Sequence, residues 1–92
     1  MQASVEISLY PLKETYEDII IEFIEQLKRN KNLRVEVNGL STQIFGDYDE
    51  IFALLQGEIK TVFEAHKAMI IIKMTPGERT PENLPERLKW AI

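Results

Sequence analysis

The spacing of apolar residues changes along this 92-residue chain in one particular order. Residues 3–10 alternate apolar and polar side chains, which is the period of a half-buried strand. Residues 15–30 and 48–66 carry apolar residues at steps of three and four, as amphipathic helices do. Residues 33–46 and 68–74 return to strand-like patterns. The order predicts an α+β, ferredoxin-like βαββαβ sandwich, with a four-stranded antiparallel sheet and both helices on one face.

The turn between the two middle strands contains the pair Asn38-Gly39. This pair is typical of a two-residue type I′ turn, because both central residues need positive φ. Such a turn sets a register in which mostly apolar residues face the core. The register pairs Val37 with Leu40, Val35 with Thr42, and Leu33 with Ile44.

Two helix starts and the last strand carry further local signals. Thr15 is an N-cap candidate for the first helix, and Asp47 with Glu50 three residues later is a strong start signal for the second. Residues 68–74 are a β-branched run without strict alternation. We therefore expect a central strand that is covered on both faces.

Composition narrows the function classes. The net charge of −4 argues against a general nucleic-acid binder, because phosphate neutralisation needs clustered Lys and Arg. No apolar run approaches the roughly 20 residues of a membrane span, and no secretory signal precedes the first strand. The absence of cysteine excludes thiol chemistry and is consistent with a reducing compartment. We expect a single cytoplasmic domain without membrane insertion.

Catalytic and metal-binding constellations are hard to build from these residues. The one histidine, His66, falls at the end of the second helix, across the predicted sheet from Ser8 and Ser41. The carboxylates around Asp47 are better explained as capping and first-turn charges. We therefore expect no enzyme activity, no catalytic residue, no metal site and no cofactor.

The sheet face without helices is the candidate functional surface. It combines hydroxyls, an amide and carboxylates with aromatic rings, and it is too apolar to be left bare. Such a set suits either a small polar heterocycle or an interface between copies of the chain, and the residues alone favour the interface. Thr42 points toward the core in the predicted register. The candidate binding residues are Glu6, Ser8, Tyr10, Ser41, Thr42, Gln43 and Phe45.

Two stretches resemble a known family. The first contains Ser-Leu-Tyr-Pro at residues 8–11, and the second contains Ser41-Thr42 followed by Gly-Asp-Tyr-Asp-Glu-Ile-Phe at residues 46–52. Together they resemble the thiamine/hydroxymethylpyrimidine-binding, YkoF-like family over about residues 3–75. The resemblance implies the same βαββαβ unit and non-catalytic binding of thiamine or its hydroxymethylpyrimidine moiety, as a carrier or a sensor.

The resemblance also implies an assembly and a division of the chain. The better-known family member carries two repeats, so a homodimer of this single-repeat chain would recreate the tandem, and a homotetramer is an extension of it. In that setting Tyr10 or Phe45 would stack on the ligand. Glu6 or Glu36 would accept from its amino group or offset its charge. Directional hydrogen bonds would come from Ser41, Thr42 and Gln43. The rival is a structural homo-oligomeric module with no ligand. Residues 1–75 would form the binding domain. Residues 76–92 would form an extension, with a short helix carrying Leu84, Leu88 and Trp90 that must dock or fray.

Overall fold

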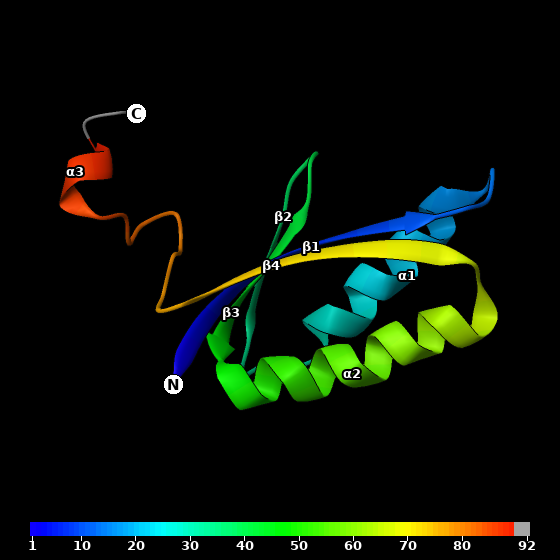
Figure 1. Ribbon diagram of the computed structural model, residues 1–92, viewed down its shortest axis with the longest axis horizontal. Coiled ribbons are helices and arrows are strands. Elements are labelled where there is room, and N and C mark those ends of the chain that lie inside the picture. The colour runs from blue at the N-terminus through cyan, green and yellow to red at the C-terminus, as the bar shows by residue number, and fades with distance from the viewer. Residues whose placement is uncertain (90–92) are drawn as a thin grey trace.

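The computed structural model describes residues 1–89 and has the predicted order of elements. These are β1 (Gln2–Pro11), α1 (Tyr16–Lys28), β2 (Arg34–Val37), β3 (Thr42–Asp47), α2 (Tyr48–Ala65), β4 (Ala68–Pro76) and α3 (Glu86–Lys89). The strand order is β2-β3-β1-β4, and all neighbours are antiparallel. The two long helices, α1 and α2, lie on the same side of the sheet (Figure 1). The predicted ferredoxin-like fold is therefore confirmed.

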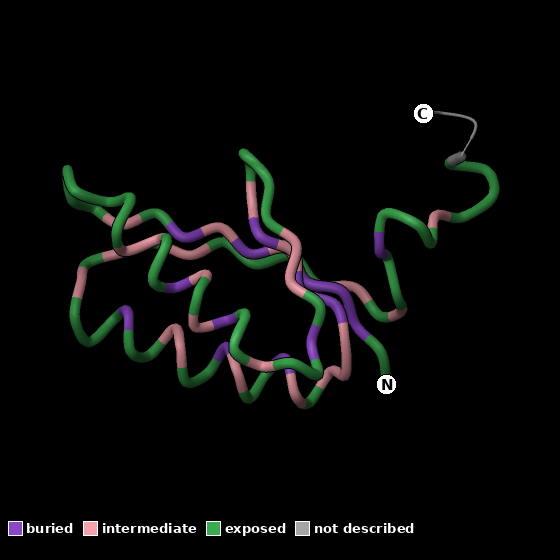
Figure 2. Tube along the Cα trace, turned by 180° about the vertical axis from the view of Figure 1, so that it is seen from behind, coloured by how far each residue is buried: buried purple, intermediate pink, exposed green. Residues whose placement is uncertain are grey.

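The core lies between the sheet and these two helices. Ala3, Val5, Ile7 and Leu9 alternate along β1 and are all buried. Figure 2 shows buried positions along the middle strands and on the sides of α1 and α2 that face the sheet. The largest fully buried side chains are Ile7, Leu27, Ile44 and Ile51.

The β2–β3 turn differs from the prediction. Val37 pairs with Thr42, and Val35 pairs with Ile44, so the turn is centred on Gly39 and Leu40. No residue here has positive φ; instead Asn38 Oδ1 accepts from the backbone N–H groups of Leu40 (2.9 Å) and Ser41 (3.1 Å). The predicted pairing of Val37 with Leu40 was wrong. The hydrogen bonds to the Asn38 side chain stabilise a different turn, so the positive φ angles of a type I′ turn are not needed. The pairing shifts by two positions, so each residue keeps its predicted face.

The last strand is also placed differently. β4 pairs only with β1 and forms an edge of the sheet, whereas β1 is an inner strand. Met69, Ile71 and Ile72 on β4 are exposed. The expectation of a central strand covered on both faces was wrong, because an unbroken apolar run shows that a strand is hydrophobic but not what covers it.

The helix caps follow the sequence signals to different degrees. Asp47 Oδ2 accepts from the backbone N–H groups of Asp49 (3.1 Å) and Glu50 (3.2 Å), which confirms the predicted start of α2. The hydrogen bond from Glu50 N–H is the main reason that the pKa of Asp47 is lowered. Thr15 does precede α1, but its side chain makes no capping hydrogen bond.

Residues 77–82 fold back over the open face of the sheet. Gly77 N–H donates to Gln2 O (2.8 Å), and Ser4 Oγ donates to Gly77 O and accepts from Arg79 N–H (both 2.8 Å). Thr80 is buried. Helix α3 lies apart from the sheet in Figure 1, and Leu88 on it is exposed. Leu84 precedes α3, and Trp90, which the sequence placed on this helix, lies outside the described residues.

Candidate functional site

The sheet opens where β1 continues beyond β3. Strand β3 pairs with Gln2 through Ile7 of β1, whereas β4 pairs with β1 as far as Pro11. Residues 8–11 therefore have a strand neighbour on one side only. In Figure 1 the β2–β3 hairpin turns away from this end of β1, and α1 lies below it.

A cavity of about 420 Å³ occupies this opening. Four of the predicted site residues line it: Ser8, Tyr10, Ser41 and Thr42. Thr42 is buried and faces the core side, as its position in the strand predicted. The cavity lies within the size range of small-molecule sites, and its walls are mostly apolar with a few hydroxyls and backbone groups.

The other three predicted residues lie elsewhere. Glu6, Gln43 and Phe45 line a second, shallower hollow of about 350 Å³ on the open face. Lys73 and Arg79 border this second hollow. The structure therefore divides the predicted site into two neighbouring parts.

One hydrogen bond connects the two parts. Ser41 Oγ donates to Glu6 Oε2 at 3.0 Å. The other oxygen of this carboxylate, Glu6 Oε1, lies 3.7 Å from Lys73 Nζ. Glu6 thus places a negative charge beside a hydroxyl that lines the first cavity.

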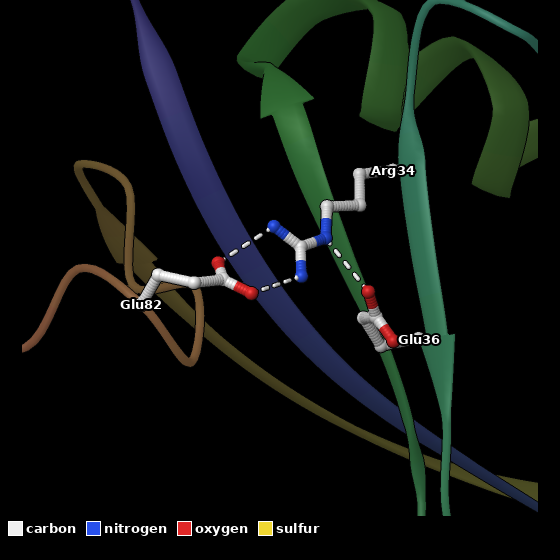
Figure 3. Close-up of polar contacts among 3 residues, drawn as sticks. All are labelled: Arg34, Glu36 and Glu82. Atoms are coloured by element: carbon white, nitrogen blue, oxygen red, sulfur yellow. Dashed lines mark hydrogen bonds and ion pairs between the residues drawn. The ribbon is translucent and has the colours of Figure 1, made fainter.

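Phe45 does not offer a free aromatic face in the second hollow. Its side chain is buried, and the Arg34 guanidinium lies over the ring, 5.9 Å from the centroid. Arg34 also donates to Glu36 (2.7 Å) and makes a bidentate pair with Glu82 of the C-terminal segment (2.8 and 2.7 Å), as Figure 3 shows. This pair lowers the pKa of Glu82 to about 2 and raises that of Arg34 above its ordinary value.

Sequence reasoning missed part of the cavity wall. Tyr16, at the first turn of α1, lines the cavity although its spacing marked it as one member of an apolar helical stripe. Asn38 and Gly39 were identified as turn residues. Both belong to the observed turn, which is centred one residue later, on Gly39 and Leu40, and both also border the cavity. The available signal was that Tyr16 lies only five residues after Pro11, which also lines the cavity.

The cavity has a distinct chemical character. Within the described chain, the residues that line it include no carboxylate, imidazole, ammonium or guanidinium group. Across residues 1–89 no group of three His, Cys, Asp or Glu side chains is arranged to hold a metal ion. His66 borders a different groove, between α1 and α2. The described wall of the first cavity thus combines apolar and aromatic surface with uncharged hydrogen-bonding groups.

Comparison with known proteins identifies the relationship. The model of the YKOF-related family matches residues 2–75. The chain belongs to the YKOF-related family. The residues that carry the motifs, 8–11 and 41–52, fall inside the matched region. No curated protein matches this YKOF-related chain.

Several solved structures share the fold. A hypothetical protein of Methanocaldococcus jannascii is 24% identical with a TM-score of 0.74, covering 98% of this chain and 95% of its own. A Thermotoga maritima protein, named as a candidate thiamine biosynthesis/salvage protein, is 15% identical with a TM-score of 0.73, covering 99% and 97%. A Streptococcus pneumoniae protein is 19% identical with a TM-score of 0.72, covering 97% and 99%. At these identities the likeness establishes the fold.

No helix within residues 1–89 is long and apolar enough to cross a lipid bilayer.

Proposed function

We propose that this YKOF-related chain binds thiamine or its hydroxymethylpyrimidine moiety, without catalysis, as a homo-oligomeric carrier or sensor. The observation that carries the proposal is the uncharged cavity at the end of β1, which Ser8, Tyr10 and Ser41 line with hydroxyls and an aromatic ring. Family membership and the name of the Thermotoga maritima protein support the same ligand class.

The chemistry of the ligand fits the two-part site. A pyrimidine ring is flat and carries hydrogen-bonding nitrogens, so it suits a mostly apolar cavity with hydroxyls on its wall. Thiamine adds a cationic thiazolium ring. Tyr10 and Tyr16 provide aromatic rings for a cation–π interaction, which is worth about 2 kcal/mol when the cation is desolvated. Glu6 lies beside the cavity because it accepts a hydrogen bond from Ser41, which lines the cavity.

The absence of charged side chains from the described wall of this cavity supports binding rather than turnover. General acid–base catalysis needs a titratable group within hydrogen-bond reach of the reacting atom. The described wall of the cavity offers the phenols of Tyr10 and Tyr16 but none of the His, Asp, Glu or Lys side chains that most often serve as acid or base.

Isothermal titration of the purified protein with thiamine, and separately with hydroxymethylpyrimidine, tests this function. Saturable binding near micromolar, about −8 kcal/mol, is the expected result. Riboflavin, a heterocycle that carries no 4-aminopyrimidine group, serves as the negative control. Absence of heat with both pyrimidine ligands from folded protein would overturn the proposal.

A second candidate, a structural module without a ligand, rests on a different observation. Tyr10 on β1 and Met69 and Ile71 on β4 are exposed neighbours on the open face, at the end remote from residues 77–82. An exposed apolar edge strand is a surface that proteins normally cover. Assembly through this surface is compatible with a ligand site, and titration of the assembled protein separates the two candidates.

A further inference from the structure

The direction of the backbone groups of Leu9 follows from the strand pairing. Gly77 N–H donates to Gln2 O (2.8 Å) and Leu12 N–H donates to Lys67 O (2.9 Å), both in continuation of the β1–β4 register. Antiparallel strands alternate between residues that bond to one neighbour and residues that bond to the other. Even-numbered residues of β1 therefore bond to β4, and odd-numbered residues face β3. Met1, an odd-numbered residue, fits this alternation, because its C=O accepts from Tyr48 N–H (2.8 Å) on the β3 side.

Leu9 is the odd-numbered residue that follows the last β1–β3 pair, Ile7 with Thr42. Its N–H and C=O face the side on which β3 has ended. Leu9 is buried and lines the cavity. Pro11, the next odd-numbered residue, has no N–H, so Leu9 alone among residues 8–11 presents both a donor and an acceptor to this side.

Buried backbone groups need hydrogen-bond partners. In a β-ladder, the N–H and C=O of one residue bind the C=O and N–H of the residue opposite. A flat heterocycle can replace that residue if it carries an acceptor nitrogen next to an amino group. A 4-aminopyrimidine has this arrangement, with the ring nitrogen at position 3 beside the amino group at position 4.

We propose that Leu9 recognises the aminopyrimidine edge of the ligand through its main chain. Leu9 N–H donates to the ring nitrogen, and Leu9 C=O accepts from the exocyclic amino group. The inference rests on the proposed function, because it assigns the edge of the ligand that the cavity reads. In this arrangement the hydroxyls of Ser8 and Ser41 bind the substituents of the ring, and Leu9 binds its amino edge.

The closing experiment compares hydroxymethylpyrimidine with an analogue in which a methyl group replaces the 4-amino group. The two molecules have nearly the same shape, but the analogue cannot donate to Leu9 C=O and should bind about tenfold or more weakly. In ¹⁵N-resolved spectra, the parent ligand should shift the Leu9 amide and slow its hydrogen exchange. The Ile7 amide, already paired with β3, is the internal reference.

A matched pair of variants isolates the N–H group. Leu9→Pro and Leu9→Ala both lose the buried side chain, but only the proline variant loses the donor. The proline variant should bind hydroxymethylpyrimidine about tenfold more weakly than the alanine variant. Circular dichroism establishes that both are folded. If the proline variant does not fold, the amide measurements on the natural chain decide.

The outcomes separate this inference from the function on which it rests. Heat of binding without a change at the Leu9 amide, or equal affinity for the parent ligand and its 4-methyl analogue, would overturn the role of Leu9 and leave the binding function standing. No binding of hydroxymethylpyrimidine or thiamine by the folded protein would overturn both.

Discussion

Ser41 Oγ donates a hydrogen bond to Glu6 Oε2 across 3.0 Å, and this contact joins the cavity at the end of β1 to the hollow on the open face. Ser41 belongs to the turn after β2, whereas Glu6 lies in the middle of β1. The contact holds the carboxylate beside the uncharged cavity. One ligand can therefore place a neutral group in the cavity and a cationic group beside the Glu6 carboxylate.

Replacing Ser41 by alanine should weaken ligand binding. The change removes a hydroxyl from the cavity wall and releases Glu6 from its partner. We expect about a tenfold loss of affinity for thiamine in isothermal titration, typical of one hydrogen bond that involves a charged group. Thr61→Ala is the control, because Thr61 Oγ1 donates to Gly57 O on α2, remote from the cavity. Equal affinities of the Ser41 variant and the natural protein would exclude Ser41 from the site.

Replacing Glu6 by glutamine should discriminate between the two ligands. Thiamine is a cation and hydroxymethylpyrimidine is neutral, so loss of the carboxylate should weaken thiamine binding about tenfold while changing pyrimidine binding less. The matched control is Glu36→Gln, which removes a carboxylate paired with Arg34 on the same face. An equal effect of Glu6→Gln on both ligands would contradict a role in offsetting charge.

The corrected turn has a consequence for stability. Leu40 is 91% exposed at the tip of the hairpin, whereas Ile44 is completely buried. Leu40→Ser should therefore change the free energy of unfolding by less than about 0.5 kcal/mol, whereas Ile44→Ala should lower it by about 2–5 kcal/mol. Urea denaturation measures both. A large loss with Leu40→Ser would support the two-residue turn at Asn38-Gly39.

A charge on β4 should disrupt the proposed homo-oligomer. Ile71 is exposed on the edge strand, so Ile71→Lys should lower the mass measured by light scattering without unfolding the chain. Leu40→Lys, an equally apolar and more exposed position on the hairpin turn, is the control and should keep the mass of the natural protein. Unchanged mass of the Ile71 variant would place the interface elsewhere.

Acid should release residues 77–82 from the sheet. The pKa of Glu82 falls from 4.5 to about 2 because Arg34 donates to its carboxylate. Because the pKa of Glu82 is lower in the docked state, the ionised carboxylate stabilises docking at pH values above 4.5. This stabilisation is lost as the pH falls from about 5 through about 2. The chemical shift of the Arg79 amide, which donates to Ser4 Oγ, should follow this transition. In Glu82→Gln the transition should disappear; if it persists, another group controls docking.

Much of the candidate site could be predicted from single residues. Ser8, Tyr10, Ser41 and Thr42 were expected to bind a ligand, and they line one cavity. Glu6, Gln43 and Phe45 were expected beside them but line the other hollow. Their separation arises because β3 leaves β1 after Ile7, and the alternation of side chains in a single strand does not indicate where a neighbouring strand ends.

The sequence by itself determined the order of elements, the faces on which the residues of β1, β2 and β3 lie, and the start of α2 at Asp47. These properties depend on residues within a few positions of one another, through periodicity and capping. Tertiary structure decided that β4 is an edge strand, that Val37 pairs with Thr42, and that Leu9 faces an open cavity. These properties depend on contacts between segments distant in the chain, where several pairings satisfy the same local pattern and only the packing of the whole sheet selects one.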